Sequence, residues 1–376
     1  MKYYIICGER SGDIHASNLL KELKKKDPDA IIRGIGGDLL QNEGATLLYH
    51  YKNLAVMGFK EVLAGIFKFK QILATCTRDV ESFNPDAVIF IDFAGFNMLL
   101  ASRIQSLKCL KFYYIAPKIW AWNQKRGYKI KRLFDKIYVI LPFEPEFFRK
   151  FEVQAKYVGN PVCDAVNSFI PDRDFIQKHK IVKTSGIIAL LPGSRKQELI
   201  HSMPVFREVV RSFPDKTFGI SVISSLPQHL YESVINQPNV IPVFEDNYNL
   251  LYNSEAAVVT SGTATLETAL FDVPQVVVYR TSKVNYSIAR RLIRVKYISL
   301  VNLVADKVVV KELIQDQFNT ANVIEELKQL IDNQSYRESV LKGYQAVRLL
   351  LGNVNASKTT AQEISEALNT KRVEYF

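Results

Sequence analysis

The chain has 376 residues, of which 48% are hydrophobic and 23% are charged, a composition typical of a globular protein of roughly two domains. Its formal net charge of +11 favours an anionic partner such as a phosphorylated substrate or an acidic membrane surface. Nucleic acid is disfavoured because the basic residues are spread along the chain and no nucleic-acid-binding module is recognisable. The four cysteines lack CxxC spacing, so we expect core residues in a reducing compartment.

Short β-branched or aromatic runs alternate with helical periodicity in the first half, which is typical of a parallel sheet covered by helices. Strands are expected near residues 3–7, 31–34, 46–48, 87–91, 111–115, 137–141 and 156–158, and helices near 12–26, 60–83 and 95–107. No apolar run reaches the roughly 20 residues that span a bilayer. The chain opens on a strand rather than a signal peptide, so we expect a soluble or peripheral protein.

The alternation starts again in the second half. Strands are expected near 186–191, 217–223, 239–242, 256–260 and 275–279, helices near 196–213, 226–236, 247–253 and 263–271, and further helices beyond about 320. A polar stretch at 171–174 separates the halves. The sequence therefore predicts an α/β protein of two Rossmann-like, doubly wound domains, residues 1–165 and 166–352, with a helix at 353–376 that packs back on the first. A ligand cleft between them would face the carboxyl ends of both sheets.

Two segments of the first half follow strands at the edge where open α/β sheets place their sites. The loop 8–13 opens a helix, so its amides could approach a ligand. A tight turn capped by Ser11 or Asp13 is the alternative. Asp92 ends the buried run 87–91 and could accept a proton from an attacking hydroxyl, or it could cap the following helix.

Two loops of the second half suit a phosphate. Gly193 and Ser194 can present amides beside the permanent charge of Arg195, although a surface turn with Arg195 paired to a nearby acid is the alternative. The loop 261–263 repeats this arrangement before a helix, and Glu267 could accept from sugar hydroxyls. A capping box is the alternative there. Two such loops in one half favour a nucleotide-diphosphate site.

No metal or cofactor is expected. The D-x-D strings at 27–29 and 172–174 fall in turns, and the five histidines lack ligand spacing. The positive groups around a leaving phosphate would therefore come from Arg195 and from helix N-termini.

Two stretches mix aromatic and basic residues. Residues 56–70 could form an interfacial helix, or a helix whose apolar face packs in the core. Residues 117–126 hold both tryptophans beside basic residues and could line an acceptor cleft or anchor a loop. The membrane contacts expected from the first stretch are Met57, Phe59, Ile66, Phe67 and Phe69.

Several segments in the same order resemble one family. They are GERSGD at 8–13, GIGG at 34–37, AVMGFKEVL at 55–63, IDFAGFN at 91–97, APKIWAWNQKR at 116–126, LPFE at 141–144, LPGSR at 191–195, SGTATLE at 261–267 and SLVNLVADKVVVKEL at 299–313. With them the chain resembles the lipid-A-disaccharide synthases, bacterial glycosyltransferases of GT-B architecture.

The resemblance implies transfer of 2,3-diacylglucosamine from its UDP derivative to 2,3-diacylglucosamine 1-phosphate (lipid X), which gives the β-1',6-linked precursor of lipid A and UDP. It implies a metal-independent enzyme, peripheral on the cytoplasmic face of the inner membrane of a Gram-negative bacterium, that contacts an anionic membrane and no nucleic acid. Whether it forms a homodimer is open.

The same resemblance implies residue roles. Asp92 would be the general base on the acceptor 6-hydroxyl, with inversion at the anomeric carbon, and Glu9 would lie near the reacting sugars. The UDP-sugar would contact Gly193, Ser194, Arg195, Ser261, Gly262, Thr263, Glu267 and Asn302. The acceptor side would hold Ser11, Gly12, Trp122 and Arg126.

The chain departs from the family pattern at two places. Ala94 and Gly95 stand where the family commonly has Pro-Asp, so a second carboxylate near Asp92 is missing, and Asn160 replaces a common histidine. One rival is another GT-B enzyme, such as a different UDP-sugar transferase or a UDP-N-acetylglucosamine epimerase, and the epimerase would not need the stretches 55–63 and 116–126. The other is a non-catalytic protein that binds membranes or nucleotides.

Overall fold

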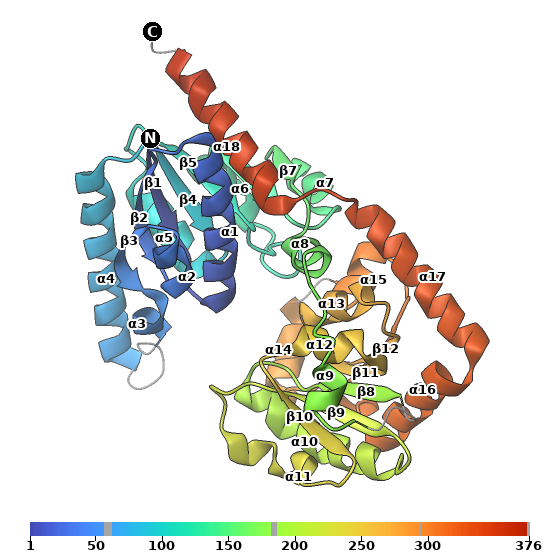
Figure 1. The fold of residues 1–376 in the computed structure, drawn as a ribbon. Coiled ribbons are helices and arrows are strands. Elements are labelled where there is room, and N and C mark those ends of the chain that lie inside the picture. Colours follow the sequence, from blue (N-terminus) through green and yellow to red (C-terminus); the bar gives the residue numbers. More distant parts are fainter. Residues whose placement is uncertain (56–61, 182–185, 293–294, 374–376) are drawn as a thin grey trace. The chain divides into compact units, whose positions relative to one another are not determined.

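The computed structural model describes residues 1–55, 62–181, 186–292 and 295–373. The chain divides into two compact units. Unit 1 is Met1–Pro161 with Asn353–Phe376, and unit 2 is Val162–Gly352. Each unit is built around its own sheet (Figure 1).

Unit 1 holds a sheet of seven parallel strands in the order β3-β2-β1-β4-β5-β6-β7. The strands are β1 Lys2–Ile6, β2 Ile31–Gly36, β3 Thr46–His50, β4 Ala87–Ile91, β5 Leu110–Tyr114, β6 Lys136–Val139 and β7 Ala155–Tyr157. The helices are α1 Arg10–Lys26, α2 Asp38–Asn42, α3 Tyr51–Ala55, α4 Val62–Phe83, α5 Ala94–Arg103, α6 Arg126–Leu133, α7 Glu144–Arg149 and α18 Ala356–Val373.

Unit 2 holds six parallel strands in the order β10-β9-β8-β11-β12-β13. The strands are β8 Ile187–Leu191, β9 Thr217–Val222, β10 Val240–Phe244, β11 Ser254–Thr260, β12 Gln275–Tyr279 and β13 Lys311–Ile314. The helices are α8 Pro161–Asn167, α9 Phe175–Lys178, α10 Lys196–Arg211, α11 Glu232–Ile235, α12 Asn247–Tyr252, α13 Ala264–Leu270, α14 Lys283–Leu292, α15 Leu300–Ala305, α16 Thr320–Asp332 and α17 Gln334–Leu351, with short 3-10 turns at Gln228–Leu230 and Gln315–Gln317.

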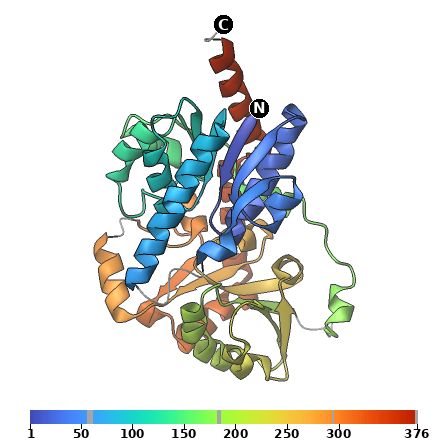
Figure 2. The same cartoon turned by 90° about the vertical axis from the view of Figure 1, so that its left-hand side faces the viewer.

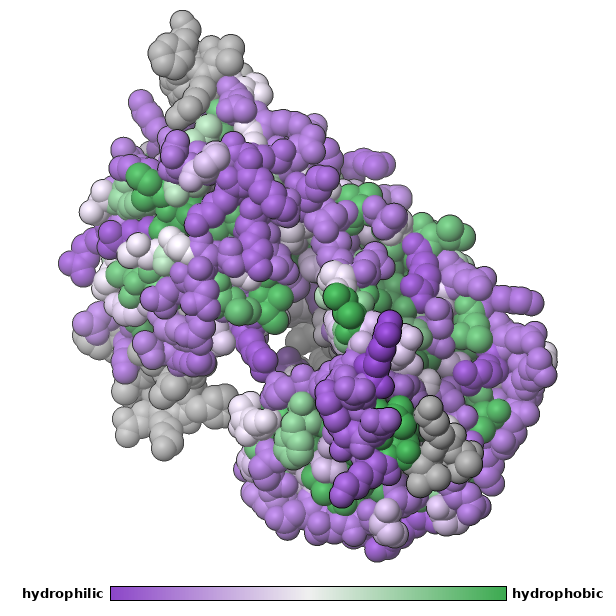
Figure 3. Space-filling view, in the orientation of Figure 1, coloured by the Kyte–Doolittle hydropathy of each residue, from purple (hydrophilic) through white to green (hydrophobic). Residues whose placement is uncertain are grey.

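The central strands are buried on both faces, as the apolar runs of a parallel sheet require. Every residue of β4 and of β8 is buried. Apolar residues of α10 and α16 pack on one face of the unit 2 sheet, and residues of α9 and α12 pack on the other. Hydrophilic residues predominate on the face of each unit seen in Figure 3.

The C-terminal helix α18 belongs to unit 1 and packs along α1, as the red ribbon in Figure 1 shows. An ion pair joins Lys156 to Glu363 of this helix. Gly159, at a φ of +97°, lets the chain approach closely, because a Cβ there would lie 2.1 Å from the Val354 carbonyl oxygen. Only glycine fits such a contact without strain.

The expected strands are confirmed, with shifts of a few residues at their ends. The helix expected at 226–236 is wrong, because the structure has a 3-10 turn and the short α11 there. The sequence also gave no sign of α14 or of the edge strand β13. All four cysteines are free and buried. Among the described residues, no helix is long and apolar enough to cross a membrane.

Candidate active site

Both sheets reverse their strand order at one point, which is where open α/β sheets bind ligands. In unit 1 the strand β1 lies between β2 and β4, and in unit 2 the strand β8 lies between β9 and β11. The loop 8–13 and Asp92 follow β1 and β4, and the loops 192–195 and 261–263 follow β8 and β11. These four candidate segments therefore lie at the switch points of their units.

Asp92 lies on a turn of unusual backbone conformation. Asp92 and Phe93 have φ values of +46° and +45°, a region that costs a bulky side chain of order 1–3 kcal/mol. The turn is held by two bonds to the Asp92 carbonyl oxygen, one from the Tyr113 hydroxyl at 2.7 Å and one from the Asn97 amide at 2.7 Å. Both bonds end on the main chain of Asp92 and not on its carboxylate.

The Asp92 carboxylate is not used as the helix cap that was its alternative role, since the N-cap residue of α5 is Phe93. Burial raises the pKa of Asp92, while the nearby Lys118 ammonium and a hydrogen bond from the Phe93 amide oppose that rise. A carboxylate of raised pKa beside a cation suits a general base. Tyr113, Asn97 and Lys118 complete this site and were not singled out from the sequence.

Gly8 brings the first loop against the Asp92 turn. A Cβ at Gly8 would lie 2.3 Å from the Phe93 ring, so the ring occupies the place of a side chain. Phe93 stacks on Phe96 at 5.3 Å between ring centres, and Phe96 meets Phe69 of α4 edge-on at 5.9 Å. A row of aromatic rings thus connects α4 to the candidate base.

Phe69 is the expected membrane contact whose side chain the structure describes. It is 37% exposed, as a membrane contact would be, and it also packs on Phe96, as a core residue would. Met57 and Phe59 lie outside the described residues. The side chains of Ile66 and Phe67 lie outside them too.

Gly8→Ala should displace the Phe93 ring and with it the Asp92 turn. We expect a loss of about 1–3 kcal/mol in the free energy of unfolding, as for other overpacked sites, together with a lower turnover. Gly95→Ala is the matched control, because a Cβ there meets nothing within 4 Å and alanine favours a helix by about 0.5–1 kcal/mol. Thermal unfolding of both variants checks this. Equal stability of the two would contradict the packing role of Gly8.

The carboxylate of Asp13 is fully engaged elsewhere. It is buried and accepts hydrogen bonds from the amides of Gly37, Leu39 and Leu40 at 2.7–3.2 Å, so it fixes the GIGG loop and the start of α2. The N-cap residue of α1 is Glu9, so the alternative in which Ser11 or Asp13 caps this helix is wrong.

The other residues of this loop differ in exposure. Glu9 and Ser11 are exposed. Gly12 is buried, and a Cβ there would lie 3.0 Å from that of Cys7. Gly12 therefore contributes close packing and its backbone only.

The tryptophan segment has a buried end and an exposed end. Trp120 is buried and donates to Glu144 at 2.9 Å, and the amides of Ile140 and Leu141 donate to the same carboxylate. Burial raises the pKa of Glu144 to about 7, against these hydrogen bonds. Trp122 is 49% exposed, and the Arg126 guanidinium lies 4.6 Å from its ring.

Each of the two roles predicted for this segment, anchoring a loop and lining an acceptor cleft, therefore suits a different tryptophan. Trp120 anchors the loop, and its partner Glu144 was not predicted from the sequence. Trp122 and the half-buried Arg126 form a cation–π pair, whose exposed tryptophan is available to a ligand.

In unit 2 the LPGSR loop adopts the arrangement that was its alternative. The Glu198 carboxylate accepts from the amides of Ser194 and Arg195 at 2.9 and 3.1 Å, and the Arg195 guanidinium lies 3.5 Å from it. Gly193, at a φ of +98°, makes room, since a Cβ would lie 2.2 Å from a Glu198 oxygen. A diphosphate at these amides must displace Glu198. Arg195 itself is 79% exposed.

The loop 261–263 does not form the capping box that was its alternative. Thr263 is the N-cap residue of α13 without a side-chain capping bond among the described residues. Thr265 donates instead to the Gly262 carbonyl oxygen at 2.8 Å, and Ser261 donates to that of Ile298 at 2.7 Å. Gly262 and Thr263 are exposed, so a ligand can reach the start of α13.

Glu267 lies one turn into α13 and is largely enclosed. Burial raises its pKa, and the hydroxyl of Tyr248, 3.4 Å away, opposes that rise. Tyr248 in turn packs on Phe169 and Phe271. The sequence did not indicate Tyr248, because it comes from α12 and meets Glu267 only in the folded unit.

The expectation that Asn302 contacts the sugar needs correction. Asn302 is fully buried. Its side-chain amide donates to the Val310 carbonyl and to Glu312, and its oxygen accepts from the amides of Val309 and Val310. All its polar atoms are used inside unit 2, so it positions the chain around it rather than a ligand.

Comparison with known proteins decides the family. The model of the family described as lipid-A-disaccharide synthetase matches residues 3–365. The lipid-A-disaccharide synthase of Myxococcus xanthus is 35% identical over 98% of both chains, and that of Geobacter metallireducens is 34% identical over 98% of this chain and 97% of its own. The chain belongs to the lipid-A-disaccharide synthetase family.

Solved structures share the fold of this family member at low sequence identity. The UDP-GlcNAc 2-epimerase of Neisseria meningitidis, bound to UDP-GlcNAc, is 17% identical with a TM-score of 0.67, over 97% of this chain and 100% of that one. The calicheamicin glycosyltransferase CalG4 is 14% identical with a TM-score of 0.64, over 98% of both. The two parallel-sheet domains are those of the GT-B fold, and this family member is a glycosyltransferase.

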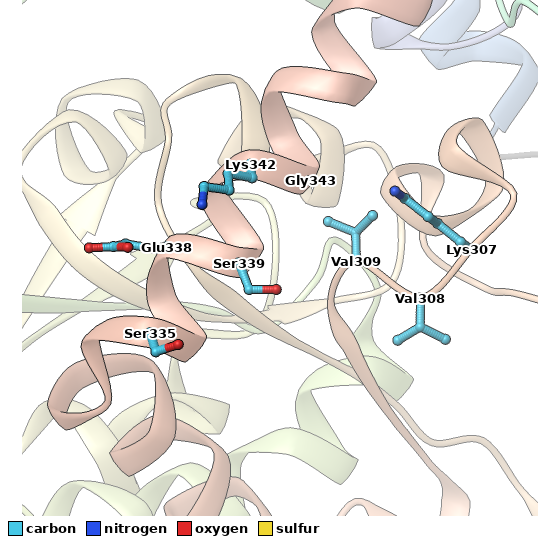
Figure 4. A pocket seen from close by; sticks show the side chains of 8 residues that line it. All are labelled: Lys307, Val308, Val309, Ser335, Glu338, Ser339, Lys342 and Gly343. Atoms are coloured by element: carbon cyan, nitrogen blue, oxygen red, sulfur yellow. The ribbon is translucent and has the colours of Figure 1, made fainter.

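A surface hollow of about 460 Å³ lies elsewhere on unit 2 of the family member. Figure 4 shows its walls, formed by α17 and by the segment after α15. None of the candidate site residues lines it. Among the described residues, no group of three or more histidine, cysteine, aspartate or glutamate side chains could hold a metal ion.

Proposed function

We propose that the chain transfers 2,3-diacylglucosamine from its UDP derivative to the 6-hydroxyl of 2,3-diacylglucosamine 1-phosphate. The bond from the anomeric carbon to the UDP oxygen breaks, and a bond from that carbon to the acceptor oxygen forms with inversion. The acceptor proton passes to Asp92. Family membership supports this reaction. The observation that carries the role of Asp92 is its carboxylate on a rigid turn at the switch point, with only its main chain engaged by Tyr113 and Asn97.

Unit 1 is the acceptor domain in this proposal, and unit 2 is the donor domain. Lys118 near Asp92 suits the 1-phosphate of the acceptor, and it disfavours the protonated form of the base. Glu9 and Ser11 are exposed on the adjacent loop, where they can contact sugar hydroxyls. Trp122 and Arg126 offer an aromatic face and a cation to the same substrate.

In unit 2 the leaving UDP gains negative charge as the sugar departs, so cations and amides that face it lower the barrier. Arg195 is free to turn toward a diphosphate, because its pairing with Glu198 is exposed and long. The start of α13, with Gly262 and Thr263, offers amides to the same group. Glu267 accepts from the ribose hydroxyls. Ser261 fixes the loop through its bond to Ile298.

We place the enzyme on the cytoplasmic face of the inner membrane, where both lipid substrates would be reached from the surface. The net charge of +11 favours an anionic bilayer, and Phe69 gives α4 an exposed aromatic residue. Homodimer formation stays a prediction, as does a cleft between the two units.

The purified protein should release UDP from UDP-2,3-diacylglucosamine only when the acceptor is added, in detergent micelles that contain EDTA. A new disaccharide 1-phosphate must appear in equal amount, as mass spectrometry can show. Release without acceptor would indicate a hydrolase or an epimerase instead. No turnover by folded protein would overturn the proposal, and activity that EDTA abolishes would overturn its metal independence.

A further inference from the structure

Helix α14 lies in the connection between β12 and β13, at the end of the unit 2 sheet that carries the donor site. It runs from Lys283 to Leu292. Ser282 caps its start, accepting from the Asn285 amide at 3.2 Å. Figure 2 shows α14 as the orange helix at the margin of unit 2.

The chain before α14 is fixed to the end of β13. The Arg280 guanidinium donates to the carbonyl oxygens of Gln315 and Phe318 at 2.5–3.2 Å. The Thr281 amide donates to the Gln315 side chain at 2.8 Å, and that side chain donates back to the Thr281 carbonyl oxygen at 3.2 Å. The point where the helix leaves the unit is therefore rigid.

The chain after α14 returns to the same strand. The amides of Ile298 and Ser299 donate to the Glu312 carboxylate at 3.0 and 2.9 Å, and the Ser299 hydroxyl donates to it at 2.7 Å. Ser261 of the donor loop holds the Ile298 carbonyl oxygen. Helix α14 thus belongs to a connection whose two ends are fixed beside the donor site.

Most side chains of this helix whose exposure the structure describes lie at the surface. Of its residues with a described exposure, all are exposed except the half-buried Tyr286, and Val284 is 69% exposed. The apolar positions Val284, Ile288 and Leu292 follow one another at intervals of four in the sequence, the spacing of an apolar stripe on a helix. Val284 is the residue of this stripe whose exposure the structure describes, and a helix with this pattern can bury its apolar side against another surface.

The charge of this connection identifies that surface. The sequence from 273 to 305 contains no aspartate or glutamate, whereas α14 carries Lys283, Arg290 and Arg291, all of them exposed. At about 100° per residue these three side chains fall on one side of the helix, next to the apolar stripe. A basic side beside an apolar one is the pattern of a helix that lies in the interface of an anionic bilayer.

We infer that α14 is a membrane-docking helix of unit 2, which lies on an anionic lipid surface and holds the mouth of the donor site close to it. Arginine and lysine side chains contact lipid phosphates, and the stripe that begins at Val284 enters the boundary of the acyl chains. The choice of a bilayer as partner rests on the proposed function. This surface differs from the stretch 56–70 of unit 1.

The test is cosedimentation of the full-length protein with vesicles of equal parts phosphatidylglycerol and phosphatidylcholine, without substrate. Arg290→Glu with Arg291→Glu should weaken binding about tenfold or more, because each basic residue near an anionic surface contributes a several-fold gain. Val284→Glu should weaken the binding that persists at high salt, where charge is screened. The matched control is Lys328→Glu with Lys342→Glu, which changes net charge equally at exposed positions of α16 and α17 and should have a much smaller effect.

Vesicle binding of the α14 double variant equal to that of the control would overturn the inference, and so would wild-type binding to pure phosphatidylcholine as strong as to the mixture. A change in oligomeric state instead of vesicle binding would assign the helix to a second copy and also overturn it. Circular dichroism should show every variant folded, and Arg290→Gln with Arg291→Gln is a milder pair that tests the same charge. If the protein lacked transferase activity but bound vesicles through these arginines, the docking helix would be supported and the proposed reaction would be overturned. Failure of the docking inference and failure of the proposed function are therefore distinguishable.

Discussion

Asp92→Asn is expected to lower turnover by about 10²–10⁴-fold, the range that a positioned general base contributes. Asparagine keeps the size of the side chain, and the bonds from Tyr113 and Asn97 go to the main chain of residue 92, so the turn should persist. The KM for both substrates should change little, because the lost group acts on the reacting hydroxyl. Initial rates of disaccharide formation in micelles measure both constants.

The direction of the pKa shift of Asp92 gives a second test of its role, through the pH dependence of stability and of turnover. Burial raises the pKa of Asp92 in the folded protein, so the folded state binds its proton more readily than the unfolded chain does. The charged carboxylate therefore costs stability once the pH exceeds the ordinary aspartate pKa, and that cost is complete above the raised value. At neutral pH the neutral Asp92→Asn variant should be as stable as the wild type or more stable. The wild-type rate should fall as the pH drops through the raised pKa.

Asp29→Asn is the matched control for this substitution. Asp29 is exposed in a turn of unit 1, so its change should affect neither turnover nor its pH dependence. An Asp92→Asn variant that is folded and retains wild-type turnover would show that another group takes the acceptor proton. A large loss of stability would instead assign Asp92 a structural role.

The fold was predictable because its strands are continuous apolar runs bounded by turns, and a parallel sheet needs such runs. The run Ala87–Ile91 has no other reasonable place than a buried strand. The strand β13 escaped prediction because Lys311 and Glu312 occupy its first half, and an edge strand tolerates them.

The place of the site was predictable from the strand order, but the use of each carboxylate was not. Asp13, Asp92 and Glu198 all lie near switch loops. The Asp13 carboxylate accepts hydrogen bonds from amides of the GIGG loop, and the Glu198 carboxylate accepts hydrogen bonds from amides of its own loop. Asp92 differs, because its carboxylate accepts only from the adjacent Phe93 amide among the causes of its pKa shift and lies near Lys118, a distinction that depends on distant segments. The prediction that Asn302 contacts a ligand needed correction for a similar reason. Its side-chain amide already donates to the Val310 carbonyl oxygen and to Glu312.

Arg195→Ala should lower turnover by about 10²–10³-fold, the usual cost of removing one group that stabilises charge in a transition state. The free energy of unfolding should hardly change, because the guanidinium is 79% exposed and its contact with Glu198 is 3.5 Å long, and such pairs contribute little. Arg195→Lys should recover part of the rate, since it restores the charge but not the two-pronged contact to phosphate.

Arg211→Ala on the same helix is the matched control. Arg211 is 59% exposed and pairs with Glu208 at 3.2 Å, so it resembles Arg195 in its exposure and in its weak ion pair but lies at the other end of the helix from the switch point. Glu198→Gln adds a further test, because a diphosphate must displace the Glu198 carboxylate from the amides of Ser194 and Arg195. Removal of that negative charge should tighten UDP binding, as calorimetry can measure. If Arg195→Ala and Arg211→Ala proved equally active, the charge facing the diphosphate would have to come from α13 alone.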